Sequence, residues 1–341
     1  MPRAPLPADW AGLADEELLN LRLCDLPLTI DNQLSERTQI LRSELERAGL
    51  WANIHFYLSD EWFTPDGATS IAIPFYLAHP RLEKLEETQM LEVEGGEYEW
   101  CMRILRHEAG HAVDNAFKLR LRRMRRQVFG SYKKPYPESY IPRPYSKSFV
   151  LHLDSWYAQS HPDEDFAETF AVWLTPSSEW RQRYAGWPAV KKLEYMDATM
   201  RSIRGKAPRI DNPDEVDPLR RLRKTLRQHY RLKRRHYGVE YPNFYDRDLR
   251  RLFSDSPEFA GNITAAQFIG RIRRTTRRVV AEWTGIYQYT IDQVIEDMIE
   301  RSRELKLRLA VPEDQARQEF TVLLTVQTMN HLHSGGHRLF L

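Results

Sequence analysis

The sequence has very little cysteine. Only Cys24 and Cys101 occur among 341 residues, far apart and in no CxxC pair. A disulfide framework and a zinc site built from thiolates both need several suitably spaced cysteines, so neither is expected. Any metal bound by this chain must therefore be held by histidine and carboxylate side chains.

Long apolar runs are absent as well. The longest candidates, such as residues 71–78, have the length of a strand and fall short of the ~20 residues that a membrane-spanning helix needs. The N-terminal stretch has no apolar run of signal-peptide length, and acidic residues follow early. The sequence therefore predicts a protein that does not cross a membrane and that resides in the cytoplasm.

Neither sign of charge dominates. Lys and Arg number 50 and Asp and Glu 48, which leaves a formal net charge of +2. No global field therefore draws the protein toward nucleic acid. Basic runs at 119–127 and 219–238 are interpreted as solvated helix faces paired with acids elsewhere. A nucleic-acid partner is not expected.

The first third of the chain predicts one helix and a small sheet. Residues 31–50 carry leucine and isoleucine at roughly helical spacing among charged residues, which is typical of an amphipathic helix. Residues 52–59 and 71–78 are rich in β-branched and aromatic side chains and flank a turn-rich stretch, so we expect two strands. A third short strand is predicted at 90–96, before a helix that contains the sequence HEAGH.

The remainder is predicted to be mostly helical after a long loop. Residues 130–147 are dense in Pro and Tyr, which excludes a regular helix. Helical patterns resume at 162–175 and cover nearly everything after residue 188, apart from polar, Pro-containing breaks at 207–218 and 238–244. The fold class expected from this order is α+β. The predicted domains are a domain with a small sheet at 1–210 and a mainly α-helical C-terminal region at 211–341.

The HEAGH sequence places His107 and His111 one helical turn apart, with Glu108 beside them. Imidazoles at positions i and i+4 of a helix can both reach one ion, and zinc hydrolases use this spacing. HExxH also occurs by chance, and histidine pairs also occur as structural core residues. The core alternative is disfavoured because the apolar side chains gather on the opposite face, namely Cys101, Met102, Leu105, Ala109, Ala112, Val113 and Ala116.

A third ligand is needed, because catalytic zinc takes three protein ligands and leaves one position for water. In segment 155–174, Pro162 and the acids after it are typical of a helix N-terminus. On such a helix Glu164 and Glu168 lie together, one turn apart. We select Glu164 as the ligand and Glu168 as the group that orients a ligand histidine through its other ring nitrogen. The reverse order of these roles, and two ordinary N-terminal helix acids, remain the alternatives.

The two motifs together resemble a known class of enzymes. HEAGHAVD at 107–114, followed by EDFAETF at 164–170, resembles the gluzincin class of zinc metallopeptidases. The segments are similar to those of the anthrax lethal factor family, whose catalytic domain runs HExGHAVD and ExFAExF. They are also similar to a group of bacterial proteins called putative zinc-binding metallopeptidases. The specific match covers roughly residues 100–175.

This resemblance implies a zincin-like fold and one Zn²⁺ per chain, bound by His107, His111 and Glu164. It also implies that Glu108 is the general base. A tyrosine seven positions before the ligand glutamate stabilises the oxyanion in the lethal factor family, and here that position is Tyr157.

We therefore predict a zinc metallopeptidase, a hydrolase that cuts peptide or protein substrates whose identity the sequence leaves open. The alternative is a catalytically silent, zinc-containing binding or structural module. A closed site with four protein ligands, for example one that includes His161, would favour that alternative.

Overall fold

The chain forms two compact units. The computed structural model describes residues 9–137, 139–140, 142–143, 146–154, 156–237, 245–333 and 339–340. The first unit comprises Met1–Gln89 and Val93–Arg231, with Leu341, and the second comprises Met90–Glu92 and Leu232–Phe340. Among the described residues, no helix is both long enough and apolar enough to span a bilayer.

Two parallel strands form the sheet of the first unit. Strand β1 (His55–Ser59) pairs with β2 (Ser70–Pro74), and β2 is buried along its whole length. Both predicted strands are confirmed, although the second is shorter than expected. It ends at Pro74, which has no N–H to donate to a ladder, and Phe75–Ala78 form a 3-10 helix.

The predicted strand at 90–96 is wrong. Met90 is the last residue of helix α3 (Pro80–Met90), and turns follow it. Leu91 and Gly95 have φ angles of 71° and 75°, which lie outside the range of an extended strand. The guanidinium of Arg37 donates to the Gly95 carbonyl at 3.1 Å, which holds this turn in place before the next helix.

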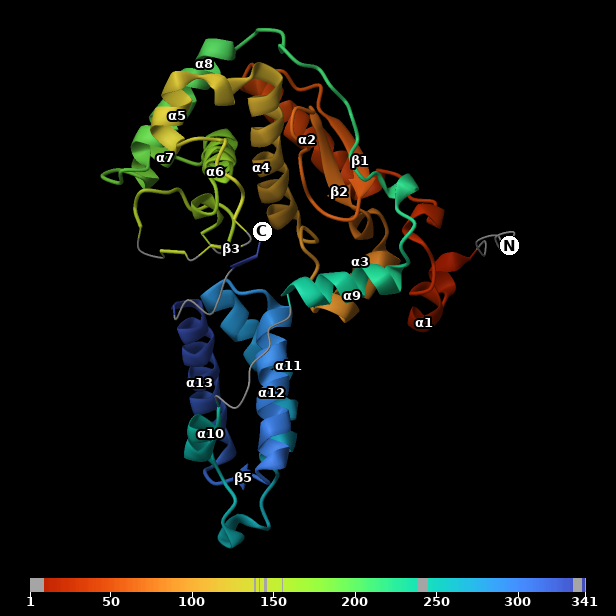
Figure 1. Cartoon of the computed structure of the whole chain (residues 1–341), viewed down its shortest axis with the longest axis vertical. Coiled ribbons are helices and arrows are strands. Elements are labelled where there is room, and N and C mark those ends of the chain that lie inside the picture. Colours follow the sequence, from red (N-terminus) through yellow and green to blue (C-terminus); the bar gives the residue numbers. More distant parts are fainter. Residues whose placement is uncertain are drawn as a thin grey trace. The chain divides into compact units, whose positions relative to one another are not determined.

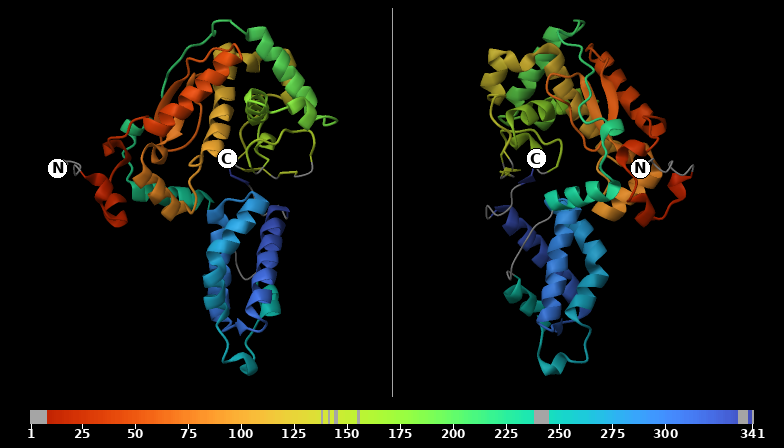
Figure 2. Two further views of the ribbon diagram at one scale, coloured as in Figure 1. Left: turned by 180° about the vertical axis from the view of Figure 1, so that it is seen from behind. Right: turned by 45° about the vertical axis from the view of Figure 1, so that its right-hand side comes forward.

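Helix α4 (Tyr98–Phe117) carries HEAGH and lies in the middle of the first unit, between β2 and α6 (Pro162–Leu174) (Figure 1). Helix α2 (Asn32–Arg47), predicted at 31–50, packs beside α4 (Figure 2). The other elements of this unit are α1 (Asp15–Leu18), α5 (Arg123–Phe129), β3 (Ser139–Tyr140), α7 (Trp180–Arg183), α8 (Val190–Ile203) and the beginning of α9 (Leu226–Tyr237).

Two segments predicted to lack a regular helix contain none, and the predicted break at 238–244 lies outside the described residues. The described part of residues 130–147 contains no helix, and residues 207–218 contain none either. The second segment runs along the sheet: the Asn212 carbonyl accepts from the Thr69 N–H at 2.7 Å, and the Tyr57 hydroxyl donates to the Val216 carbonyl at 2.9 Å. The predicted domain limit at residue 210 stays a prediction.

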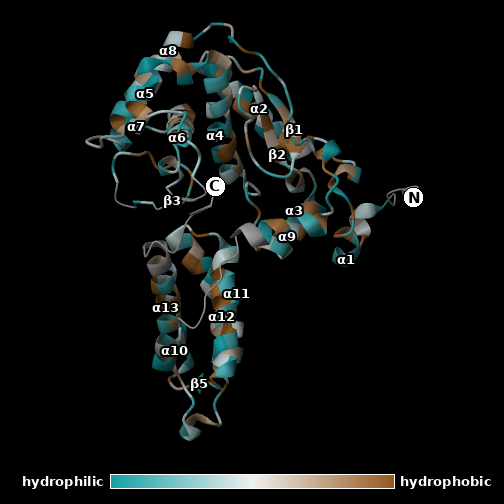
Figure 3. Cartoon of the chain, viewed as in Figure 1, coloured by the Kyte–Doolittle hydropathy of each residue, from teal (hydrophilic) through white to brown (hydrophobic). Residues whose placement is uncertain are grey.

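The second unit is a group of helices with its own apolar core. Long helices α11 (Ala265–Thr284), α12 (Gln288–Glu304) and α13 (Glu313–His333) lie side by side (Figure 2). Hydrophobic and hydrophilic residues alternate around each of them (Figure 3), as expected of amphipathic helices that share a core. The short elements are α10 (Asp246–Leu252), β4 (Phe253–Ser254), β5 (Arg308–Leu309), which is antiparallel to β4, and β6 (Leu339–Phe340).

Candidate metal centre

The site forms where α4 and α6 approach each other at small residues. A methyl group added to Gly110 would lie 2.9 Å from the Cα of Ala167 and 3.2 Å from the Cβ of Phe170. A glycine and an alanine therefore let the two backbones come close. As a result, the face of α4 opposite its apolar residues is covered by α6, and His107 and Glu108 are buried.

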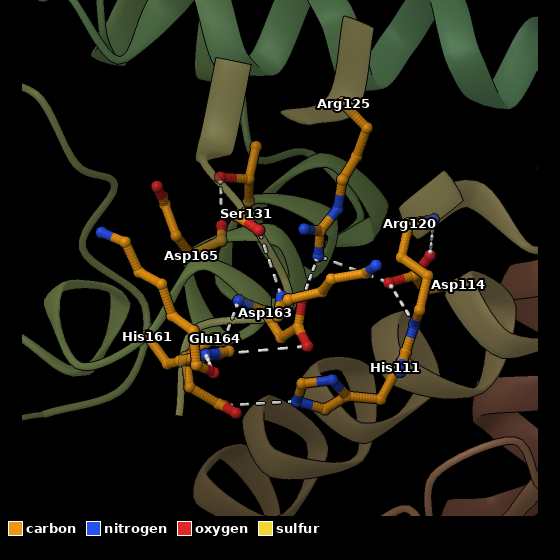
Figure 4. A network of polar contacts seen from close by, with 12 residues as sticks. His111, Asp114, Arg120, Arg125, Ser131, His161, Asp163, Glu164 and Asp165 are labelled. Carbon is orange, nitrogen blue, oxygen red and sulfur yellow. Dashed lines mark hydrogen bonds and ion pairs between the residues drawn. The ribbon is translucent and has the colours of Figure 1, made fainter. Parts of the chain in front are cut away.

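Three side chains from the two helices converge on one point. The Nε2 atom of His107 lies 2.9 Å from Oε2 of Glu164 and 3.2 Å from Nε2 of His111. The Nε2 atom of His111 lies 3.2 Å from the same Glu164 oxygen (Figure 4). Each residue offers one ligand atom, so this group can hold a metal ion.

The spacing of these atoms fits zinc. A tetrahedral zinc ion with bonds of about 2.0–2.1 Å separates neighbouring ligand atoms by about 3.3 Å. The three separations of 2.9, 3.2 and 3.2 Å are close to that value. Two imidazoles and one carboxylate are also a donor set found in catalytic zinc sites. The residues present therefore fit a zinc ion.

The charges around the position where His107, His111 and Glu164 converge favour the binding of a cation. Burial alone lowers the pKa of His107, but hydrogen bonds to Glu164 and Glu168 outweigh burial and raise that pKa well above its usual value. Burial raises the pKa of Glu164, but His111 and His107 outweigh it and hold the pKa well below its usual range. Two buried carboxylates thus surround the histidines with negative charge that a metal ion can neutralise.

Glu164 and Glu168 contact the histidines in different ways. Glu164 faces both histidines with one oxygen, whereas Glu168 contacts only His107, at the other ring nitrogen. Its Oε1 lies 2.9 Å from His107 Nδ1, and its Oε2 accepts from the backbone N–H of Leu153 at 2.9 Å. The His107 ring is therefore fixed from both sides, with Nε2 directed toward Glu164.

Glu108 is held by a loop residue. The Thr64 hydroxyl lies 2.8 Å from Glu108 Oε2 and 3.1 Å from the Glu108 backbone carbonyl. Thr64 belongs to the connection between β1 and β2, so this connection passes over α4 at the motif. Burial lowers the pKa of His111, but the Glu164 carboxylate outweighs burial and raises that pKa, and Glu108 adds to the rise.

Tyr157 lies beside the centre, in a 3-10 helix (Tyr157–Gln159) before α6. Its ring centroid is 5.5 Å from that of His107. Burial, and then the charges of Glu164 and Glu108, raise the pKa of the phenol well above its usual value. The hydroxyl therefore stays protonated and keeps a hydrogen to donate.

Both ring nitrogens of His161 are engaged elsewhere. Its Nδ1 accepts from the backbone N–H of Asp163 at 3.1 Å, which caps α6, and its Nε2 lies 2.9 Å from the Lys134 carbonyl. Because Nδ1 is the acceptor, Nε2 carries the hydrogen and donates it. His161 has no lone pair left for a metal in this arrangement.

A buried ion-pair network joins the helices that carry the metal centre to α5. Figure 4 shows the guanidinium of Arg125 between the carboxylates of Asp114 and Asp163, and it forms an ion pair with each of them. Arg125 is completely buried. The interpretation of 119–127 as a solvated basic face is therefore wrong for this residue, which instead ties α5 to α4 and α6.

Sequence analysis missed two residues of the site. Thr64 contacts Glu108, but no motif surrounds it in the sequence. The Tyr136 hydroxyl lies 2.7 Å from Glu164 Oε1, but in the sequence Tyr136 is one of several tyrosines in the Tyr- and Pro-rich loop. The density of tyrosines in that loop was the one available signal, and it did not single out a residue.

Comparison with known proteins agrees with this geometry. Residues 83–185 match the family described as putative zinc-binding metallo-peptidases. The matched segment includes α4, α6 and the loop between them, and so contains His107, His111 and Glu164. No curated protein and no solved structure matches the chain.

Proposed function

We propose that this chain is a zinc metallopeptidase that hydrolyses peptide bonds, with one Zn²⁺ held by His107, His111 and Glu164. The observation that carries the proposal is the convergence of these three side chains from α4 and α6. The match of residues 83–185 to a zinc-binding metallo-peptidase family supports it. Membership of the gluzincin class, a zincin-like fold and the likeness to the lethal factor family are part of the same proposal.

Zinc bound there would supply Lewis-acid chemistry, because it lowers the pKa of water and polarises a carbonyl group. Glu108 acts as the general base: its carboxylate accepts a proton from the attacking water and then transfers it to the leaving amine. The Thr64 hydroxyl keeps Glu108 Oε2 in position for both transfers.

Two further side chains assist. The Tyr157 hydroxyl, which stays protonated, donates a hydrogen bond to the oxygen that becomes negatively charged during attack. Glu168 accepts from His107 Nδ1 and so keeps Nε2 free for the metal. In this assignment Glu164 is the ligand and Glu168 the orienting carboxylate, because only Glu164 faces both histidines.

The second candidate is a catalytically silent zinc-containing module in which the metal joins two helices. A structural zinc site is closed by four protein ligands. The group of ligand atoms holds three residues, and both ring nitrogens of His161 are already engaged. These contacts favour the enzyme over the structural module.

Glu108→Gln separates the two functions. We expect this variant to keep about one zinc per chain and to lose peptidase activity on a fluorogenic peptide library, because it preserves the ligands but removes the base. Glu99→Gln, an exposed acid in the first turn of the same helix, is the matched control and should stay active. Zinc-loaded wild type with no peptidase activity would favour the silent module, and failure of wild type to bind zinc would refute both.

Other aspects follow from the sequence and stay proposals. The substrate class is peptides or proteins, and the balanced charge argues against nucleic acid as a partner. A cytoplasmic location stays part of the proposal.

A further inference from the structure

The carboxylate of Glu164 has different partners at its two oxygens. Oε2 faces the two histidines at 2.9 and 3.2 Å, whereas Oε1 lies 2.7 Å from the hydroxyl of Tyr136. A neutral phenol donates to an ionised carboxylate, so Tyr136 is the donor in this contact. The carboxylate is therefore fixed from both sides, with one oxygen turned toward the metal position.

Tyr136 is itself held by the beginning of α6. Its ring stacks on the imidazole of His161, with centroids 3.9 Å apart and an interplanar angle of 20°. The same imidazole donates to the Lys134 carbonyl and accepts from the Asp163 N–H. His161 thus attaches residues 131–137 to the beginning of α6, and Figure 4 shows His161 beside Glu164.

We infer that Tyr136 is a positioning residue of the metal centre: its hydroxyl occupies Glu164 Oε1 so that Glu164 binds zinc through Oε2 alone. The inference rests on the proposed function, since it concerns the proposed ligand. Through this contact residues 131–137 set the affinity for zinc. They also keep the fourth position of a tetrahedral ion open, because a second Glu164 oxygen cannot take it.

This role differs from that of a general structural tyrosine. Tyr136 is 51% exposed, so its ring adds little to the core, and its removal should leave the fold intact. It also differs from the role proposed for Tyr157, whose ring lies tilted beside that of His107 and whose hydroxyl is proposed to donate to the substrate. The effect of Tyr136 must therefore pass through Glu164 to the metal.

The test uses the full chain as wild type and as Tyr136→Phe. Zinc affinity is measured by competition with a fluorescent chelator, and the visible absorption of the Co²⁺-substituted proteins reports coordination number. We expect Tyr136→Phe to weaken zinc binding by about tenfold or more, the range seen when an outer partner of a ligand is removed. Its Co²⁺ absorption should fall, because a freed Glu164 can bind through both oxygens and higher coordination absorbs less strongly than a tetrahedral site.

Tyr132→Phe is the matched control, since it removes a hydroxyl from the same loop, and the Tyr132 ring lies against the guanidinium of Arg120. It should bind zinc as the wild type does. In a Glu164→Ala background, Tyr136→Phe should change zinc affinity by less than about twofold, because the partner through which it acts is gone.

The outcomes separate the inference from the proposed function. If the wild type binds zinc and Tyr136→Phe binds it equally well, the positioning role is refuted while the metal centre stands. An equal loss of affinity in the Glu164→Ala background also refutes it, because the effect then does not pass through Glu164. Failure of the wild type itself to bind zinc would refute the proposed function.

Discussion

Replacing Gly110 by alanine tests whether the close contact between α4 and α6 sets the geometry of the metal centre. The added methyl group would lie 2.9 Å from the Cα of Ala167. Carbon atoms in favourable contact are about 3.5 Å apart, so the helices would have to separate by about 0.6 Å, the difference from 2.9 Å. Overpacking of this kind costs about 1–3 kcal/mol, and the better helix propensity of alanine offsets about 1 kcal/mol. We expect a net loss of about 0–2 kcal/mol in the free energy of unfolding.

The effect on metal binding should be larger than the effect on stability. His107 and His111 flank Gly110 on α4, and Glu164 lies one turn before Ala167 on α6. A separation of about 0.6 Å exceeds the ~0.2 Å tolerance that zinc–ligand distances allow. We therefore expect zinc affinity to fall by about tenfold or more while the protein stays folded.

The assay combines urea unfolding of the metal-free protein with zinc titration against a chelator. Gly270→Ala is the matched control, because Gly270 lies within helix α11 and an added Cβ would meet nothing within 4 Å. That variant should gain up to about 1 kcal/mol and bind zinc unchanged. If Gly110→Ala bound zinc as tightly as the wild type does, the argument that helix spacing sets the ligand geometry would be refuted.

Two further predictions concern buried and paired charges. Arg106 donates to both oxygens of buried Glu44 at 2.8 Å. Arg106→Met should therefore lower the free energy of unfolding in urea by about 3–5 kcal/mol, and adding Glu44→Leu should restore most of that loss. A loss below about 1 kcal/mol for Arg106→Met would contradict the prediction. Burial raises the pKa of Asp292, but Arg273 and Arg277 outweigh it and lower that pKa below 3.8. Because the pKa of Asp292 is lower in the folded than in the unfolded chain, the stabilisation is present above about pH 4 and is lost as the pH falls. Asp292→Asn should therefore make the free energy of unfolding depend less on pH below about pH 4. An unchanged pH dependence would refute the pairing.

The local elements of this fold follow well from the sequence. Helices α2 and α6 begin and end within a few residues of their predicted limits, because an apolar stripe repeats along each and Pro162 marks the first turn of α6, and α4 contains HEAGH as predicted. The structure also brings the three proposed ligands together, and the i and i+4 spacing on one helix and the acidic start of another are what restricted the choice. Their chemical role stays a prediction.

The error at 90–96 has a clear physical origin. The apolar Leu91 and Val93 with the Gly pair read as a short strand, but Pro80 begins a helix that extends to Met90 and buries Leu82 and Leu85. Short apolar runs do not distinguish a strand from the end of a helix. The helical periodicity of residues 80–90 extends the helix to Met90, and the positive φ of Leu91 ends it there.

Tyr136 shows why the outer parts of the site escape sequence analysis. An irregular loop has no periodicity from which the direction of a side chain can be deduced. That direction depends on His161, whose imidazole donates to Lys134 and stacks on the Tyr136 ring. In the sequence, His161 stood only as an example of a fourth ligand for a closed structural site. It caps a helix and fixes a loop instead, because the backbone groups of Asp163 and Lys134 occupy both of its nitrogens, and which backbone groups come within reach is decided by tertiary packing.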